Sequence, residues 1–254
     1  MADEFYIGWE AQAASGVGRF IRRALVALIS IALLVAVVLA VSQRMIGEGA
    51  FEWGTVKMFA GTLRMKPYPH LLVPRPGGAE GQNQWSAYHL VAPWKFGLNP
   101  ALTAAFDGQS VRLKGTLIYR GSQTMIEVVE GSIQSDNTST AARLPEVLSL
   151  GRQVLTGEIV DSKCFFGVMN PGQLTPHRAC AIRCISGGIP PVLLVRRDPA
   201  PPLYFILVAA DGRPVNQAVL DFVAEPVEIT GDVERQGDLL VLRADPATFR
   251  RVGR

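Results

Sequence analysis

The residues best suited to chemistry lie together in one stretch, residues 161–191, which reads DSKCFFGVMNPGQLTPHRACAIRCISGGIPP. It contains all three cysteines, Cys164, Cys180 and Cys184, and one of the three histidines, His177. On a helix, residues at i, i+3 and i+7 share a face, so the imidazole and two thiols would project together, with the third thiol arriving from a preceding loop. Zinc accepts thiolates and imidazole at four tetrahedral positions. The spacing C-x12-H-x2-C-x3-C therefore predicts a Cys3His metal site of structural type.

Other interpretations of the same residues stay open. Copper(I) also prefers thiolate ligands and is the alternative metal. Without a metal, a disulfide from Cys164 to Cys180 or to Cys184 would staple the segment and leave one thiol free, because three is an odd number. His177 would then be a surface residue, or its imidazolium would lower the pKa of that free thiol. The thiols would act directly in a metallochaperone or a thiol-redox protein, although no C-x-x-C motif is present.

Asp161 lies three residues before Cys164 and has two expected roles. It would hold the second ring nitrogen of a metal-bound His177, since ligand imidazoles usually donate that N–H to a carboxylate or a carbonyl. Alternatively, it would cap a local turn, as aspartate commonly does. Gly187 and Gly188 are expected to end the helix that carries the ligands.

The segment resembles small, poorly characterised bacterial envelope proteins that share the patterns G-x-[IV]-x-D-x-x-C, H-x-x-C-A-x-x-C and G-x-P. Ten residues carry the resemblance here: Gly157, Ile159, Asp161, Cys164, His177, Cys180, Ala181, Cys184, Gly188 and Pro190. It covers residues 157–244, about a third of the chain. The resemblance implies an envelope module with an OB-like barrel and implies no mechanism.

Short apolar runs bounded by glycine and proline predict strands in the region that precedes this segment. The expected strands are 56–65, 70–73, 88–92, 111–119 and 124–129. A short helix is expected at 99–106, with Asn99 as its N-cap and Pro100 in its first turn. An OB-fold, which is a small five-stranded barrel, has this order of three strands, a helix and two strands.

The chain also contains an internal repeat. A shift of 116 residues, without a gap, superposes Tyr88 on Tyr204, Phe106 on Phe222, Val111 on Val227, Leu113 on Ile229, Gly115 on Gly231, and Gly121 on Gly237. A strand at 154–160 would match the first strand of the first copy, with Gly157 on Gly61. Gly61 and Tyr88 are 27 residues apart, whereas Gly157 and Tyr204 are 47 apart, so the second copy has gained a net 20 residues where the cysteines lie. The sequence therefore predicts two tandem OB-like barrels, with the Cys/His segment inserted between the first two strands of the second.

Residues 24–42, ALVALISIALLVAVVLAVS, contain no charge, proline or glycine. Their 19 positions are close to the ~20 residues that cross a bilayer as a helix. Arg19, Arg22 and Arg23 precede the run, which places the N-terminus in the cytoplasm by the positive-inside rule. A cleaved signal peptide is the alternative, because residues 38–40 form a small-residue cleavage site, but the apolar run exceeds the usual ~7–15 residues.

These observations predict a mainly β protein with five parts. They are a cytoplasmic tail at 1–23, a transmembrane helix at 24–42, a first OB-like barrel at 52–131, a linker at 132–150 and a second barrel at 151–254. In a bacterium, the anchor would lie in the inner membrane and most of the chain in the periplasm.

Composition and motifs disfavour a nucleic-acid-binding protein and an enzyme. The net charge is only +3, with 25 Lys+Arg spread among 22 Asp+Glu, so nucleic acid is not an expected partner. G-x-S-x-G, H-E-x-x-H, P-loop and Rossmann motifs are absent, which disfavours an enzyme. The loop Trp94-Lys95-Phe96 is expected to contact protein partners, since aromatic side chains carry interface energy. We therefore expect a periplasmic scaffold or accessory subunit, of a respiratory or electron-transfer assembly; a metallochaperone or thiol-redox protein is the alternative.

Overall fold

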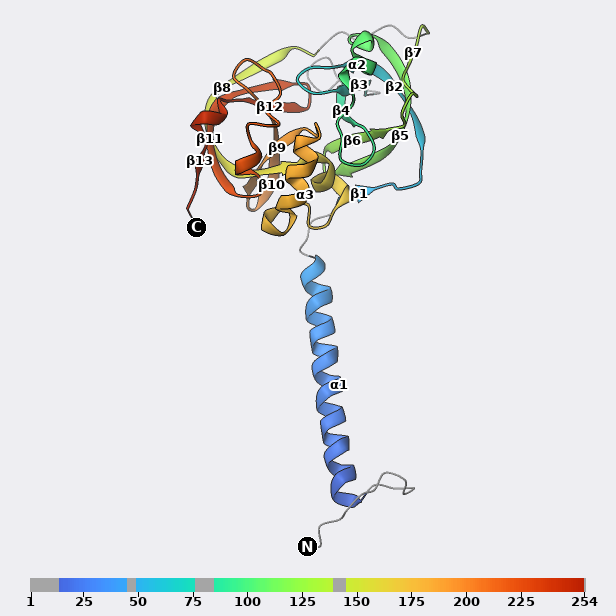
Figure 1. Cartoon of the computed structure of the whole chain (residues 1–254), viewed down its shortest axis with the longest axis vertical. Helices are drawn as coiled ribbons and strands as arrows, with labels where there is room; N and C mark the ends of the chain where they lie inside the picture. The colour runs from blue at the N-terminus through green and yellow to red at the C-terminus, as the bar shows by residue number, and fades with distance from the viewer. Residues whose placement is uncertain (1–13, 45–48, 76–84, 139–144, 254) are drawn as a thin grey trace. The chain divides into compact units, whose positions relative to one another are not determined.

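The computed structural model describes residues 14–44, 49–75, 85–138 and 145–253 (Figure 1). The protein is mainly β, with 42% strand and 28% helix, and consists of an N-terminal apolar helix and two closed five-stranded barrels. The chain forms two compact units, residues 1–47 and residues 48–254. Both barrels belong to the second unit, and the expected fold class is confirmed.

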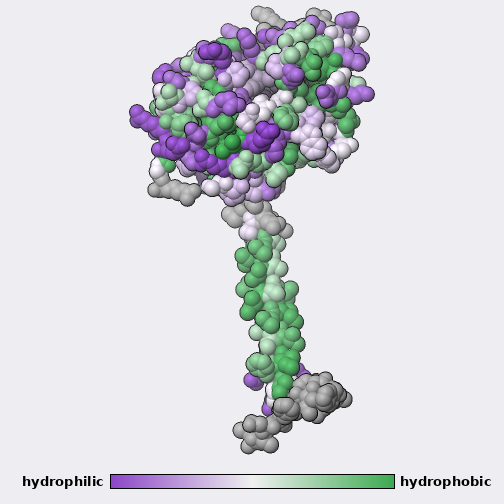
Figure 2. All heavy atoms as spheres, viewed as in Figure 1, coloured by the Kyte–Doolittle hydropathy of each residue, from purple (hydrophilic) through white to green (hydrophobic). Residues whose placement is uncertain are grey.

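The first unit contains the helix α1, Ser15–Arg44. Its candidate membrane span, Ser15–Ser42, is 28 residues long, and the most apolar 18-residue stretch within it has a mean hydropathy of 3.2. Figure 2 shows most of the surface of this helix as apolar. At 1.5 Å per residue, this span is about 42 Å long, which exceeds the ~30 Å hydrocarbon core of a bilayer. The helix is thus long and apolar enough to cross a membrane, a property that it shares with a signal sequence.

The first barrel has five main strands and two short ones: β1 (Ala50–Phe51), β2 (Lys57–Arg64), β3 (His70–Pro74), β4 (Trp85–Val91), β5 (Ser110–Arg120), β6 (Gln123–Val128) and β7 (Gln134–Ser135). The strand order is β1-β5-β2-β3-β4-β6, and the pairing of β5 with β6 closes the barrel. A helical segment, α2 (Pro100–Thr103) followed by η1 (Ala104–Phe106), lies between β4 and β5. The Asn99 side chain caps it by accepting the N–H of Ala101, as expected.

The second barrel repeats this arrangement with β8 (Val147–Asp161), β9 (Pro191–Arg197), β10 (Ala200–Val208), β11 (Pro226–Gln236), β12 (Leu239–Arg243) and β13 (Arg250–Arg251). Its order is β12-β10-β9-β8-β11-β13, and the pairing of β11 with β12 closes it. The short helices η3 (Leu220–Phe222) and η4 (Pro246–Thr248) follow β10 and β12. Between β8 and β9 the chain forms η2 (Cys164–Val168) and α3 (Leu174–Ser186), so the Cys/His insertion has the expected position.

The strand registers confirm most of the repeat. Gly61 lies opposite Val111, and Gly157 lies opposite Val227, which is 116 residues later. At both glycines an added Cβ would lie 2.5 Å from a carbonyl oxygen of the adjacent strand, so both positions need glycine for the close approach of the backbone. The strands β5 and β11, and the short helices η1 and η3, also have matching bounds under the same shift.

One part of the ungapped alignment is wrong by a residue. In the first barrel, Tyr88 pairs with Thr124. The residue 116 positions after Thr124 is Leu240, and it pairs with Phe205 rather than with Tyr204. Tyr88 and Phe205 both pack in the core of their own barrel, whereas Tyr204 packs between the barrels. Because side chains alternate along a strand, the one-residue difference reverses the face. The shift in this strand is therefore 117.

The expected linker at 132–150 is also wrong in part. Within it, β7 pairs with β5, and the carboxylate of Asp136 is buried and accepts a 2.9 Å hydrogen bond from Arg112 Nε. The strand β8 begins at Val147. The polar composition of this segment misled the prediction, because polar residues also pair at a sheet edge; residues 139–144 lie outside the described chain.

The two barrels share a third apolar cluster, which we call the junction core. Its buried members from the first barrel are Tyr68, Val91, Ile118 and Met125, and those from the second are Val160, Cys164, Phe165, Phe166, Cys184, Ile189, Val192, Leu194, Ile206, Val208, Leu239 and Val241. Each barrel also has a core of its own. The barrels therefore pack as one body, and two of the cysteines are part of the packing between them.

His89 is an unusual residue at this junction. It is 2% exposed, and neither ring nitrogen has a hydrogen-bond partner among the described residues. Its ring lies 6.3 Å from that of Phe166, centroid to centroid. Burial, followed by the charge of His70, lowers the pKa of His89 to about 3. The fold therefore holds this imidazole in its neutral form.

This burial predicts an acid-sensitive junction. Above pH 6.5, His89 is neutral in both the folded and the unfolded chain, so it does not affect the pH dependence of stability. Between pH 6.5 and about pH 3, only the unfolded chain binds a proton at His89. The free energy of unfolding should thus fall by about 1.4 kcal/mol per pH unit in this window because of His89. In urea titrations of the full chain in detergent, His89→Leu should reduce the slope between pH 6 and pH 4 by about one proton. Equal slopes in wild type and variant would contradict the prediction.

Candidate metal centre

The helix α3 positions three of the candidate ligands. His177, Cys180 and Cys184 lie on one of its faces, and His177 and Cys184 are buried. The helix ends at Gly187, whose N–H donates to the carbonyls of Arg183 and Cys184, and Gly188 follows with a φ of 100°. The helix and its glycine end are as the sequence predicts.

Asp161 positions the fourth candidate ligand. This carboxylate is fully buried at the end of β8, and its Oδ1 accepts the backbone N–H of Cys164 at 2.8 Å. Its Oδ2 lies 2.9 Å from Nε2 of His177. Asp161 therefore caps the turn and also contacts the imidazole; that it does so as the partner of a metal-bound histidine stays a prediction.

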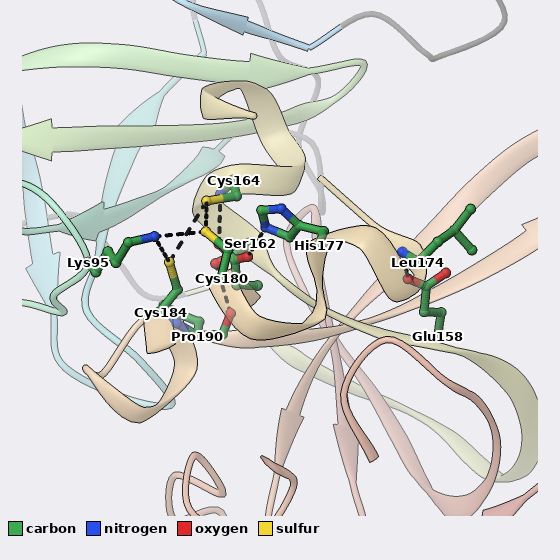
Figure 3. A network of polar contacts seen from close by, with 10 residues as sticks. Lys95, Glu158, Ser162, Cys164, Leu174, His177, Cys180, Cys184 and Pro190 are labelled. Carbon is green, nitrogen blue, oxygen red and sulfur yellow. Dashed lines mark hydrogen bonds and ion pairs between the residues drawn. The ribbon is translucent and has the colours of Figure 1, made fainter. Parts of the chain in front are cut away.

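The three sulfur atoms come together although Cys164 is far from the other two in sequence. Cys164 Sγ lies 3.8 Å from Cys180 Sγ and 3.8 Å from Cys184 Sγ, and all three sulfurs lie within 4.8 Å of one another (Figure 3). All three cysteines are free thiols. Cys164 and Cys184 are buried and Cys180 is half-buried. This geometry forms a possible metal-binding group of three cysteines.

His177 lies at the edge of the same group. A ring nitrogen of His177, Cys164 Sγ and a carboxylate oxygen of Asp161 lie within 4.8 Å of one another. In Figure 3 the imidazole lies beside the sulfur of Cys164. Because Nε2 is directed at Asp161, Nδ1 is the nitrogen that remains for a metal or for a thiol proton. Whether His177 completes a Cys3His set stays a prediction.

Lys95 reaches the sulfurs from the first barrel, which the sequence analysis did not anticipate. Its Nζ lies 2.7 Å from Cys180 Sγ and 3.8 Å from Cys184 Sγ (Figure 3). The sequence groups Lys95 with Trp94 and Phe96 as a partner-binding loop, but its side chain is directed at the cysteines instead. The residue lies 85 positions before Cys180, and no local pattern relates the two.

The charges at the site are unevenly distributed among the thiols. A hydrogen bond from the Cys164 thiol, and then the ammonium of Lys95, lower the pKa of Cys184. The hydrogen bond to Cys184, and then burial, raise the pKa of Cys164. The hydrogen bond to Cys180 is the main cause that raises the pKa of Lys95. Without a metal, Cys184 is therefore the stronger acid of this hydrogen-bonded pair and Cys164 the weaker.

A buried lysine joins the insertion to the first barrel. Lys163 is 2% exposed, and its Nζ donates to the carbonyls of Ala92 at 2.9 Å and Trp94 at 2.6 Å. The same ammonium lies 2.5 Å from Oε2 of Glu127 on β6. Nearby, the N–H of Gly97 donates to the carbonyl of Gly187 at 3.0 Å. The insertion thus holds residues 92–97, which we call the aromatic loop, at several points.

The aromatic loop exposes two large side chains. Trp94 is 79% exposed and has a φ of 61°, a left-handed conformation that is unfavourable for a tryptophan. Phe96 is 46% exposed, and the guanidinium of Arg183 lies 5.7 Å from its ring centroid. Both aromatic residues line a cavity of about 480 Å³, together with Leu102 and Val129. The contacts with the insertion hold this loop in its strained conformation.

Comparisons of the sequence with protein-family models and with curated proteins find no match. The interpretation of the site therefore depends on its own geometry and chemistry.

Proposed function

We propose that this is a membrane-anchored protein of the bacterial envelope, whose Cys/His insertion binds one zinc ion and thereby stabilises a docking surface for protein partners. The observation that supports this most is the spacing of the sulfurs. Zinc–sulfur bonds of ~2.3 Å place tetrahedral thiolates ~3.8 Å apart. Two of the three sulfur pairs are separated by 3.8 Å. Two of the three sulfur–sulfur distances thus match those of a tetrahedral zinc site, which supports the proposed ligands.

The proposed fourth ligand is Nδ1 of His177. Metal-bound imidazoles usually donate their other N–H to a carboxylate, and Asp161 accepts from Nε2 here. With Cys164, Cys180 and Cys184, it would close a four-ligand site, which is typical of structural zinc. Copper(I) on the three thiolates is the alternative metal. A structural metal contributes directly to folding stability, because the unfolded chain does not present the site.

The position of the site connects the metal to partner binding. Lys95 and the carbonyl groups of Ala92 and Trp94 contact the insertion, so an ordered insertion would keep the aromatic loop in place. Exposed aromatic side chains beside an apolar cavity are typical of interaction sites. The apolar helix α1 and the resemblance to envelope proteins support a periplasmic location with a cytoplasmic N-terminus. Such a protein would act as a scaffold or accessory subunit of a respiratory or electron-transfer assembly.

Elemental analysis with a thiol count tests the proposal. The full chain would be purified in detergent from the bacterial envelope without added metal. We expect one zinc per chain, and three thiols that react only after denaturation with a chelator. No metal together with a single reactive thiol would overturn the proposal, because it would indicate a disulfide between two of the cysteines.

A metallochaperone or thiol-redox role is the second candidate, and the geometry of Cys180 favours it. This sulfur is half-buried, whereas the other two are buried, and the Lys95 ammonium lies 2.7 Å from it. It is thus the sulfur that a metal acceptor or a second thiol would reach first. The rate of metal release separates the two functions. A structural ion should stay bound to the native protein for hours with a chromogenic chelator, whereas a transferable ion should leave within minutes.

A further inference from the structure

A second polar site lies between the barrels, and it contains none of the cysteines. It is a cleft of about 430 Å³ lined by Arg64 and Lys66 of the first barrel and by Arg213 and Arg243 of the second. Among the described residues, the only carboxylate that lines it is Asp211, whose Oδ2 lies 2.5 Å from Nε of Arg213. A cavity of this size lies within the range of small-molecule sites, ~300–1,000 Å³. Four cations from distant parts of the sequence therefore face one cavity.

Carboxylates orient Arg64 and Arg243 but leave some of their N–H groups free for another acceptor. Arg64 Nη1 lies 3.7 Å from Asp107, and Arg243 Nε donates to Glu234 at 2.7 Å. The side chains of these two arginines are only 27% and 29% exposed. A guanidinium carries five N–H groups, and each of these ion pairs uses only part of them. Both arginines are thus fixed in direction and retain donors for a further acceptor.

Two more features leave positive charge in the cleft. No carboxylate of the described residues forms an ion pair with Lys66, whose residue is exposed. The guanidinium of Arg243 packs against the backbone of Gly212, where a Cβ would lie 2.3 Å from it. The glycine therefore lets this cation lie close to the turn that carries Arg213. With four cations and one carboxylate in its described lining, the cleft keeps an excess of positive charge that an anion would neutralise.

We propose that this cleft binds a phosphate monoester group, which the forked donors of arginine and the ammonium of Lys66 would hold together. The phosphate would bridge the two barrels, because Arg64 and Lys66 lie on one and Arg213 and Arg243 on the other. The headgroup of phosphatidic acid and a soluble phosphate monoester offer this same group. The inference goes beyond the metal proposal and does not depend on it.

Calorimetric titration of the full chain with glycerol 3-phosphate, in detergent at low salt, tests the cleft. Wild type should bind, and the dissociation constant should rise about tenfold or more in Arg243→Gln and in Lys66→Met. Lys66→Met leaves no ion-pair partner behind, so it separates ligand binding from loss of folding. Arg152→Gln is the charge-matched control, because Arg152 pairs with Asp232 on the outer side of β8 and does not line the cleft.

Absence of binding to wild type, or equal weakening by Arg152→Gln and Lys66→Met, would overturn the proposal. A comparison in lipid nanodiscs then identifies the source of the phosphate. If nanodiscs that contain phosphatidic acid weaken glycerol 3-phosphate binding relative to phosphatidylcholine nanodiscs, the lipid headgroup competes for the cleft. If the lipids have equal effects, the cleft serves a soluble ester. Metal content is unaffected by any of these results, so the two proposals fail separately.

Discussion

Replacement of Cys184 by serine is expected to abolish binding of the proposed zinc ion and lower the free energy of unfolding by about 4 kcal/mol, for free zinc ~1,000-fold above its dissociation constant. Cys184 is buried, its sulfur lies 3.8 Å from that of Cys164, and a serine hydroxyl stays protonated at neutral pH and is a poor zinc ligand. For a chain of this size, the melting temperature should fall by roughly 10–15 °C. Metal analysis and thermal unfolding in detergent would measure both effects.

The same experiment contains its own controls. Ser186→Ala changes a residue of the same helix whose hydroxyl donates only to the carbonyl of Arg183, so its metal content and melting temperature should match those of wild type. Wild type treated with a chelator should melt where Cys184→Ser melts, and the chelator should have no effect on the variant. A chelator effect of equal size in Cys184→Ser and wild type would show that the metal binds elsewhere.

Loss of the Lys163 ammonium should have a comparable effect on stability. Lys163→Met leaves the Glu127 carboxylate and the carbonyls of Ala92 and Trp94 without their donor at a nearly dry junction. Removal of one partner of a buried ion pair costs about 3–5 kcal/mol, so the urea midpoint should fall clearly. Hydrogen exchange at residues 92–97 should accelerate more than exchange in β11, because the lysine holds the aromatic loop directly.

A second substitution separates the charge effect from a packing effect. In Lys163→Met with Glu127→Leu, no buried carboxylate is left unpaired, so the double variant should recover more than half of the lost stability. Fast exchange of the aromatic loop should persist, since its carbonyls still lack a donor. If the double variant is less stable than Lys163→Met, Glu127 stabilises the junction by contacts other than this ion pair.

Much of the fold was predictable because it depends on local patterns. Alternating apolar residues located the main strands, and close backbone approach made Gly61 and Gly157 recognisable as equivalent positions. The register of β10 was not predictable, because Tyr88 and Tyr204 are alike in type while they face different cores. Strand β7 was missed because it is held at its edge by polar contacts such as the one between Arg112 and Asp136.

The candidate site divides in the same way. Helical spacing placed His177, Cys180 and Cys184 on one face, and Asp161 was identifiable by its distance from Cys164. Lys95 belongs to a different barrel, and its contact with Cys180 depends on how the barrels pack. The role of Lys163 was missed for a related reason. A lysine is rarely buried, and the sequence around it does not indicate that its ammonium contacts three oxygen atoms of the first barrel. Long-range packing decides such contacts, and one sequence does not contain that information.

The junction core also constrains how the chain is made. The five main strands of the first barrel end at Val128, but Val91, Ile118 and Met125 belong to a cluster whose other members extend along the chain to Val241 in β12. During synthesis at ~5–20 residues per second, the remaining part of the chain would take about 5–20 s to emerge. For that time the nascent chain carries an uncovered apolar face, and a holding chaperone has a defined surface to protect until the second barrel arrives.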